Sequence, residues 1–303
     1  MRTFLMVIFG MFLSLAQSQV QLRIADASSS GTYHQLFTEM KETMIQYSAI
    51  DIVESNMGGG ALENLDALLS NKVNACFVHA DVVAWKAKTE DLTEYKTLLC
   101  LHQEDVHILA LNQPIVTDKG FAGYGQKTKT LTQLSDLSGL NVGAAGGGWV
   151  TANLIRLLSE VQYNVVPKFA SGNDVISALN NGSIQAAIFV GAAPLPNIEK
   201  LNSNYKLISI PDPSKLKSVY KPSTISYLNI GSSSVPTISV PCILLSKTYK
   251  TPKFVSALSG FRKTFCGSLD ELKETVGKHK AWQKVNCSDH GPWNWYELPS
   301  SGK

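Results

Sequence analysis

Two segments of this chain repeat each other at a constant spacing. Residues 64–78, NLDALLSNKVNACFV, align with residues 175–189, VISALNNGSIQAAIF, and both segments read as a short helix, a polar turn and a buried strand. The matched positions carry the same or similar side chains, namely Ala67 with Ala178, Leu68 with Leu179, Val73 with Ile184 and Ala75 with Ala186. A chain that builds the same α/β unit twice is expected to fold into two lobes with a cleft between them.

The segment Asn141–Glu160, NVGAAGGGWVTANLIRLLSE, predicts a place for a ligand. Asn141–Ala144 reads as a short buried strand, Ala145–Gly148 as a loop with three consecutive glycines, and Val150–Leu158 as a helix. A helix that begins at a glycine-rich turn presents free backbone N–H groups and the positive end of its dipole to the space in front of it. An anion or a carboxylate suits that place, although a plain strand-to-helix turn has the same pattern.

The first part of the chain carries similar turns. Leu22–Tyr47 predicts a strand, a turn at Ser28–Gly31 and a helix with an apolar face. Ile50–Ser55 predicts a second strand, and Met57–Gly60 predicts a second glycine turn. In the helix that follows this turn, Asn64 can bond to the turn or to a ligand.

A polar tip follows the next predicted strand. Ala75–Val83 begins as a buried strand and reaches His79, Ala80 and Asp81. In open α/β sheets ligands bind at the carboxyl ends of the strands, so His79 and Asp81 are candidate ligand contacts. Asp81 can also cap the helix expected around Val82–Lys86, and the two roles do not exclude each other.

Two long segments are expected to cross between the lobes. Leu98–Leu111 predicts a strand that leaves the first lobe, and Val235–Ser246 predicts the return, at a sheet edge or boundary because it holds two prolines. Gln113–Thr132 reads as an irregular surface loop. Lobe I is then expected to comprise residues 19–112 and 235–303, and lobe II residues 113–234.

The end of the chain predicts further helices in lobe I. They are expected at Pro252–Phe265 and Leu269–Val276, and the aromatic segment Pro292–Tyr296 is expected to pack across the lobes. Cys266 and Cys287 bracket this helical region, so we expect them to form a disulfide in an oxidising compartment. Cys76, Cys100 and Cys242 lie in apolar strand-like runs and are expected to be buried thiols.

Residues 1–18, MRTFLMVIFGMFLSLAQS, resemble a secretory signal peptide. A basic residue precedes an apolar run that is too short for a membrane span, and the small residues Ala16 and Ser18 suit a cleavage site. The alternative is an uncleaved N-terminal anchor. The chain beyond residue 18 is longer than a single hydrophobic core usually supports, which favours two domains.

Composition argues against several classes of function. Lys and Arg number 27 and Asp and Glu 24, without a basic block, so nucleic acid is not an expected partner. His102 and Glu104 share one face of their predicted strand while His107 points to the other, so we expect no metal. The serines before His34 read as helix caps, and no catalytic motif is found. We therefore expect no catalytic residue and no cofactor.

The order of motifs along nearly the whole mature chain resembles the TAXI class of TRAP-transporter solute receptors. The resemblance rests on short motifs in both predicted lobes, namely Gly31–Thr32–Tyr33, Gly59–Gly60 with Glu63–Asn64, Phe77–Val78 with Asp81–Val82, Gly143–Ala144 with Gly146 and Gly148, Phe189–Val190–Gly191 with Pro194, Val235–Pro236–Thr237 with Pro241, and His290–Gly291 before Tyr296–Glu297. It implies a type II periplasmic-binding-protein fold, in which each lobe is a mostly parallel sheet flanked by helices.

The resemblance also implies a ligand and a site. The ligand would be a small organic anion such as a dicarboxylate, a keto acid or an acidic amino acid like glutamate. The implied contacts are Ser30, Gly31, Thr32, Tyr33, Gly59, Gly60, Asn64, His79, Asp81, Gly146, Gly147, Gly148, Trp149, Phe189, Val190, Gly191, Pro236 and Thr237. Trp149 stands where the family commonly has a small hydroxyl residue, which suggests a larger or partly apolar ligand.

These features predict a monomeric receptor of the periplasm that closes on its ligand by hinge motion at the two crossing strands. By resemblance, its partner would be the membrane permease of a TRAP transporter. Two alternatives stay open from the sequence: a sensory module that signals to a membrane kinase, and a receptor for an ABC-type importer.

Overall fold

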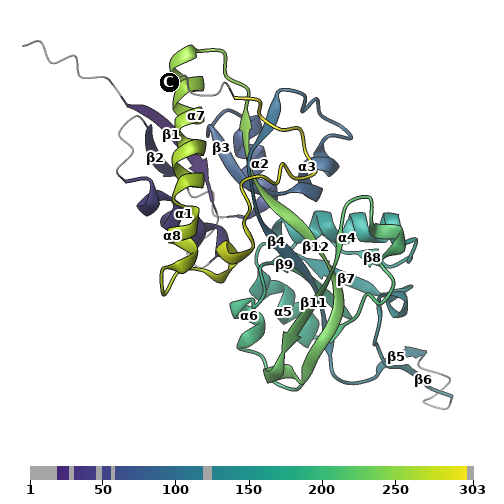
Figure 1. The fold of residues 1–303 in the computed structure, drawn as a ribbon. Helices are drawn as coiled ribbons and strands as arrows, with labels where there is room; N and C mark the ends of the chain where they lie inside the picture. Colours follow the sequence, from purple (N-terminus) through teal and green to yellow (C-terminus); the bar gives the residue numbers. More distant parts are fainter. Residues whose placement is uncertain (1–18, 27–30, 46–49, 56–58, 119–124, 299–303) are drawn as a thin grey trace, which may run out of the picture.

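The computed structural model describes residues 19–26, 31–45, 50–55, 59–118 and 125–298 (Figure 1). Its α-helices are α1 (Thr32–Thr43), α2 (Ala61–Leu69), α3 (Ala80–Lys86), α4 (Gly146–Ser159), α5 (Gly172–Asn180), α6 (Pro196–Glu199), α7 (Pro252–Gly267) and α8 (Leu269–Glu274). Its strands are β1 (Val20–Ala25), β2 (Ile50–Ser55), β3 (Ala75–His79), β4 (Tyr95–Leu111), β5 (Ile115–Asp118), β6 (Lys127–Lys129), β7 (Asn141–Ala144), β8 (Asn164–Val165), β9 (Ala186–Gly191), β10 (Tyr205–Ile208), β11 (Lys221–Tyr227) and β12 (Ser232–Lys247). Short 3₁₀ helices lie at Leu134–Leu137, Ser214–Leu216, Leu228–Ile230 and Lys280–Lys284.

The repeated unit of the sequence is confirmed. Helix α2 and strand β3 form the first copy, and helix α5 and strand β9 form the second, with the elements beginning at aligned residues. In α5 the apolar residues Val175, Ala178 and Leu179 recur at helical spacing and are buried, and the side chain of Ser171 caps the helix by accepting a hydrogen bond from the backbone of Asp174. The helical spacing of apolar residues is therefore sufficient to predict the helix in each copy.

All described strands except β5 and β6 form one continuous sheet in the order β2-β1-β3-β12-β4-β9-β7-β8, with β10 added on β4 and β11 on β12, while β5 and β6 form a separate two-stranded sheet. β1 pairs in parallel with β2 and β3, and β7 pairs in parallel with β8 and β9. Between these parallel ends, β4 and β12 run antiparallel to their neighbours. Figure 1 shows the two ends as two lobes that β4 and β12 connect. We name the end with α1–α3, α7 and α8 lobe I, and the end with α4–α6 lobe II.

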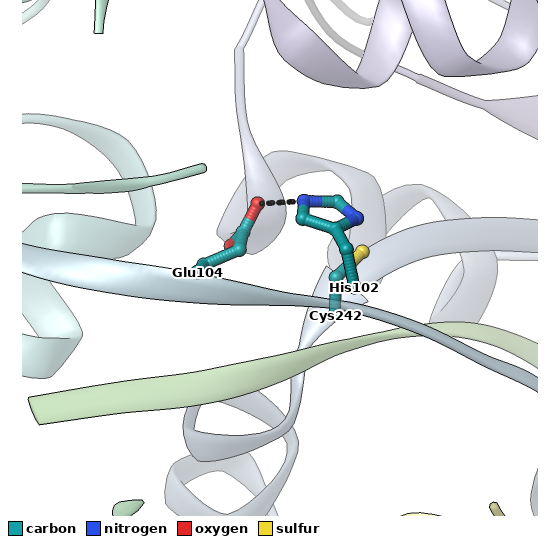
Figure 2. Close-up of side chains that lie close together, drawn as sticks. All are labelled: His102, Glu104 and Cys242. Carbon is teal, nitrogen blue, oxygen red and sulfur yellow. Dashed lines mark ion pairs between the residues drawn. The ribbon is translucent and has the colours of Figure 1, made fainter. Parts of the chain in front are cut away.

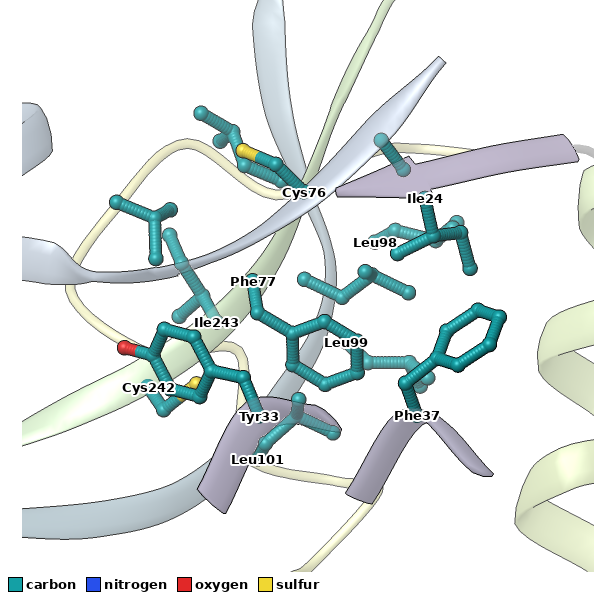
Figure 3. Packing of buried hydrophobic residues seen from close by; sticks show 14 of the residues in the cluster. Ile24, Tyr33, Phe37, Cys76, Phe77, Leu98, Leu99, Leu101, Cys242 and Ile243 are labelled. Atoms are coloured by element: carbon teal, nitrogen blue, oxygen red, sulfur yellow. The ribbon is translucent and has the colours of Figure 1, made fainter. Parts of the chain in front are cut away.

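Each lobe has its own hydrophobic packing. In lobe I a buried cluster includes Ile24, Phe37, Phe77 and Leu99, which Figure 3 shows packed together from four elements. Lobe II has two clusters, one that includes Val142, Ile155 and Ile188 and one that includes Val175, Leu179 and Ile198. Along β4, Leu101 belongs to the lobe I cluster and Val106 to a lobe II cluster. We propose that the domain division, predicted after residue 112 and before residue 235, follows this change of core within β4 and β12.

The return crossing is confirmed, but its placement at a sheet edge is wrong. The C-terminal half of β12 lies between β3 and β4, in the middle of the sheet. Pro236 pairs with Thr224 of β11, and Pro241 adjoins the position where the register of β12 against β4 shifts. A proline is tolerated at such an irregularity because a regular ladder hydrogen bond is not required there.

Two segments that were predicted as loops contain regular secondary structure. Gly146, Gly147 and Gly148 form the first turn of α4 instead of a loop before it. Gly146 has a φ of +51°, a conformation that glycine adopts without steric cost. The predicted irregular connection at 113–132 contains the antiparallel pair β5 and β6, and its residues 119–124 lie outside the described ranges.

The C-terminal aromatic segment packs on lobe I and not across the lobes as predicted. The indole N–H of Trp293 donates to the carbonyl of Tyr95 at 3.0 Å, and the hydroxyl of Tyr296 accepts from the backbone N–H of Tyr249 at 2.7 Å. The guanidinium of Arg262 lies 4.2 Å from the centre of the Trp295 ring. The segment therefore ties β4 to α7 within one lobe.

The disulfide between Cys266 and Cys287 is present as predicted, and Cys76, Cys100 and Cys242 are buried free thiols. The bond joins the end of α7 to the segment after the last 3₁₀ helix and closes a loop with a sequence separation of 21. A loop of this size is expected to contribute about 3 kcal/mol to stability by restricting the unfolded chain.

Replacement of both cysteines by alanine is therefore expected to lower the free energy of unfolding by about 3 kcal/mol, as measured by urea denaturation. Reduction of the wild-type protein with a thiol reagent should give a similar loss, while the double variant should not respond to the reagent. Equal stability of the wild type and the double variant would show that this loop is not restrained by the bond.

Among the described residues, no helix combines the length and the apolar character that a membrane crossing requires. The predicted signal peptide, residues 1–18, lies outside the described residues.

Candidate functional site

The glycine-rich N-terminus of α4 meets lobe I directly. A Cβ atom on Gly147 would lie 2.3 Å from Nε2 of His79 and 3.0 Å from Cβ of Ala61, the first residue of α2. A Cβ atom on Gly146 would lie 4.0 Å from Cα of Gly60. The N-termini of α2 and α4 therefore face each other across the two lobes, and the absence of a side chain at Gly147 is what allows the contact.

A buried carboxylate joins the lobes at the same place. Asp81, in the first turn of α3, accepts hydrogen bonds from the hydroxyl of Thr151 in α4 at 2.7 Å and from the hydroxyl of Tyr220 at 2.8 Å. Its other oxygen contacts Nδ1 of His79. Asp81 is 0% exposed, and a buried carboxylate is costly unless other groups pair with it, so each of these three partners reduces the cost of its burial. Asp81 does not cap α3, because His79 occupies the N-cap position and no side-chain cap bond forms.

Charge pairing sets the protonation of this pair. Burial alone would lower the pKa of His79, but the carboxylate of Asp81, with a smaller contribution from Glu104, raises it above its ordinary value. For Asp81 burial alone would raise the pKa, but His79 and the two hydroxyl donors lower it. His79 therefore keeps its proton to a higher pH than a free histidine, and Asp81 keeps its charge to a lower pH than a free aspartate.

A second ionic contact crosses the lobes beside α2. Glu63 accepts a hydrogen bond from the backbone N–H of Gly60 at 3.1 Å and pairs with Lys168 of lobe II. Burial alone would raise the pKa of Glu63, but Lys168 and the N–H of Gly60 lower it. In this arrangement a carboxylate occupies the N-terminus of α2, which indicates that this end of the helix accepts an anion.

Several predicted site residues meet at this contact. Gly60, His79, Asp81, Gly146 and Gly147 lie at it, Gly59 precedes α2 beside Glu63, and Gly148 packs against the carbonyl of Ile188. Trp149 packs against the clusters of both lobes, and its indole N–H donates to the carbonyl of Val166 at 3.0 Å.

The α1 turn is only partly described. Gly31 is the N-cap of α1, Thr32 begins the helix, and the hydroxyl of Tyr33 donates to Glu104 at 3.0 Å. Ser30 lies outside the described residues.

The other predicted residues have structural partners elsewhere. Asn64 is fully buried and donates to the carbonyl of Phe77 at 2.9 Å. Phe189 packs in a lobe II cluster, while Val190 and Gly191 lie in β9 beside β4. In β12, Pro236 is exposed and the hydroxyl of Thr237 donates to the carbonyl of Val106 at 2.5 Å.

Three contributors to the contact were not predicted. Thr151 could have been found, because it lies four residues after Gly147 and so shares its face of α4. The sequence around Lys168 and Tyr220 carries no comparable signal, since each reaches lobe I only through the folding of lobe II.

The continuous sheet with two α/β ends and two crossing strands is the two-lobed, type II fold of solute-binding proteins. The chain belongs to the NMT1-like family, whose model matches residues 24–285. No curated protein matches the chain significantly in sequence.

Several solved structures share the fold at low sequence identity. A structure of Tv2483 bound to L-arginine has a TM-score of 0.54 and 11% identity, covering 88% of this chain and 92% of that one. The ligand-binding component of an ABC-type import system from Staphylococcus aureus, with zinc bound, has a TM-score of 0.50 and 13% identity, covering 90% and 86%. A protein from Bordetella bronchiseptica RB50 has a TM-score of 0.50 and 13% identity, covering 88% and 76%. At these identities the likeness concerns the fold.

Proposed function

We propose that this protein is an extracytoplasmic receptor that captures a small organic anion between its lobes and delivers it to a membrane permease of the TRAP type. The observation that carries the proposal is the convergence of three helix N-termini, those of α2, α3 and α4, at one contact between the lobes. Each helix directs backbone N–H groups and the positive end of its dipole toward this place.

The contact offers a carboxylate two kinds of attraction. At the N-terminus of α2 an anionic ligand would replace the carboxylate of Glu63, which accepts from the backbone N–H of Gly60 in this structure. At the start of α4 the glycines carry no side chain of their own that would keep an anion from the backbone N–H groups. Nε2 of His79 lies against Gly147, and the raised pKa of His79, which pairs through Nδ1 with Asp81, favours the form in which Nε2 can donate to the ligand. A dicarboxylate, a keto acid or an acidic amino acid such as glutamate fits these groups without an arginine clamp.

Capture would proceed by closure of the lobes. The lobes are joined by β4 and β12, so a small change in these two strands moves one lobe relative to the other. Contacts from α2 and α4 to a ligand exist together only in the closed form, so the ligand shifts the population toward closure. The permease would then recognise the closed shape.

Location and partner follow from the same proposal. Residues 1–18 would act as a cleavable signal peptide that sends the chain to the periplasm, where Cys266 and Cys287 can be joined. An ABC-type importer is the alternative partner, because the similar Staphylococcus aureus protein is a component of such a system.

The test is a thermal-shift screen of the refolded mature protein against dicarboxylates, keto acids, amino acids and aromatic acids. A ligand at 100 times its dissociation constant is expected to add about 2.7 kcal/mol of stability. Stabilisation by small acids would support the proposal, and stabilisation by aromatic acids alone would assign the ligand preference to Trp149. If none of these acids stabilises the protein, the anion-receptor proposal is wrong.

His79→Gln is expected to lower the affinity for the best anion of this screen by roughly 10-fold or more near pH 6, because a charge-assisted hydrogen bond is worth about 1.5–3 kcal/mol. Titration calorimetry measures the change. The exposed His290 provides a matched control, and His290→Gln should bind as the wild type does. Equal affinity of the two variants would remove His79 from the site.

A further inference from the structure

A buried group of three metal-ligating side chains lies where the two crossing strands meet in lobe I. His102 and Glu104 are on β4, and Cys242 is on β12 (Figure 2). They are 1%, 2% and 0% exposed, and one ligand atom from each lies within 4.8 Å of the other two. An imidazole and a carboxylate are costly to bury without partners, so their place in a hydrophobic core beside a thiol calls for a shared role.

The geometry of the two strands places these side chains on one face. His102 and Glu104 are two residues apart in β4, so they point to the same side of the sheet. Glu104 pairs with Val240, and Cys242 lies two residues further along β12, so it shares that side. The ladder is irregular between the pairs Pro241–Gln103 and Ile243–Cys100, which leaves both Leu101 and His102 opposite the single residue Cys242.

The imidazole of His102 is the group that most requires a ligand. Both of its ring nitrogens are buried without a hydrogen-bond partner among the described residues. Nε2 lies 3.4 Å from Oε1 of Glu104, near enough for ionic contact. The other oxygen of Glu104 accepts a hydrogen bond from the hydroxyl of Tyr33 at 3.0 Å, so Oε1 is the oxygen that remains for a cation.

We propose that His102, Glu104 and Cys242 bind one divalent transition-metal cation of the zinc class. In a tetrahedral zinc site the ligand atoms are roughly 3.5 Å apart, which the 3.4 Å separation of Nε2 and Oε1 fits. Nitrogen and sulfur ligands favour zinc over calcium or magnesium, which take oxygen ligands. On binding, the sulfur of Cys242 exchanges its proton for the cation and the proton goes to solvent.

The charge of the loaded site supports the choice of a dication. One carboxylate and one thiolate neutralise two positive charges, so the burial of the complex does not leave a net charge in the core. With three protein ligands, a water molecule can fill the fourth position. Because the three side chains are buried, the cation would enter during folding or when the lobes part.

A second group of similar composition is less suited to a metal. Asp26, His34 and Glu54 also bring their ligand atoms together, but Nδ1 of His34 already lies 2.9 Å from Asp26 and 3.0 Å from Glu54. The side chain of Glu54 is 38% exposed. The imidazole of His34 therefore has a hydrogen-bond partner, whereas neither ring nitrogen of His102 has one among the described residues.

The test is to refold the mature protein with Co²⁺ or Zn²⁺ and to remove unbound metal by gel filtration. One equivalent of retained metal is expected by elemental analysis, together with a thiolate-to-cobalt charge-transfer band in the ultraviolet spectrum of the Co²⁺ form. Cys242→Ala should abolish this band. Cys76→Ala, which alters a buried free cysteine outside the group, should keep it.

A second variant covers the case in which Cys242→Ala does not fold. Glu104→Gln keeps the size of the side chain and is expected to lower retained metal at least 10-fold, with an unchanged far-ultraviolet circular dichroism spectrum as the check on folding. Absence of retained metal in the wild type, or a charge-transfer band that survives in Cys242→Ala, would overturn the proposal. The result does not depend on whether an organic anion binds.

Discussion

Replacement of Asp81 by alanine is expected to lower the free energy of unfolding by about 3–5 kcal/mol, the usual cost of breaking a buried ion pair by removing one partner. The variant leaves the imidazolium of His79 and the hydroxyls of Thr151 and Tyr220 without their common acceptor. Because two of these partners come from lobe II, the variant should also weaken the contact between the lobes.

Urea denaturation of the wild type and Asp81→Ala measures the loss. Asp66→Ala is a matched control, since the side chain of Asp66 is 51% exposed and pairs with Lys86. An exposed pair of this kind contributes only about 0–1 kcal/mol. Similar losses in both variants would contradict the role given to Asp81.

The pH dependence gives the same prediction a second readout. Because the pKa of His79 is raised on folding, the group stabilises the protein fully at pH values below the pKa of the unfolded state. This stability is lost as the pH rises through the pKa of the folded state. Because the pKa of Asp81 is lowered on folding, the group stabilises the protein fully at pH values above the pKa of the unfolded state. This stability is lost as the pH falls through the pKa of the folded state. The difference between the wild type and Asp81→Ala should therefore be largest between about pH 4 and 6.5.

Gly147→Val is expected to keep the lobes from closing fully. The Cβ atom of the new residue would meet Nε2 of His79 at 2.3 Å, and His79 is held in place by Asp81. Overpacking of this kind costs about 1–3 kcal/mol in the closed form. If closure is required for binding, the apparent dissociation constant for an anionic ligand should rise by roughly 5- to 150-fold.

Small-angle X-ray scattering checks the closure, and titration calorimetry checks the affinity. Gly147→Val should have a larger radius of gyration than the wild type. Gly267, at the end of α7, would meet no atom within 4 Å on addition of a Cβ, so Gly267→Val is the matched control and should scatter as the wild type does. A wild-type scattering profile for Gly147→Val would show that the contact at His79 can yield without opening the lobes.

Local signals in the sequence were sufficient for the units of this fold. The helical spacing of Val175, Ala178 and Leu179 and the aligned pattern in the first copy predicted both repeats, because helix and strand periodicity are encoded over a few residues. The disulfide could also be predicted from the sequence, because its two cysteines flank one helical region.

Contacts between distant segments could not be read in the same way. β12 was expected at a sheet edge because proline lacks the backbone N–H that donates to a neighbouring strand. Its pairing with both β3 and β4 depends on how distant segments come together in the fold. The partnership of Tyr220 with Asp81 depends on how the two lobes lie against each other. Cys242 joins His102 only because β12 returns beside β4, so the metal-ligating group was invisible when the residues of β4 were considered alone.

The central position of β12 has a consequence for the order in which this chain can fold. β3 and β4 each pair with β12, which is synthesised about 160 residues after β3 and only after the whole of lobe II. Until β12 arrives, β3 and β4 each present an unpaired edge that can associate with other chains. Any nascent or truncated chain that ends before β12 therefore holds two exposed edges, and protection of those edges is a requirement of its biogenesis.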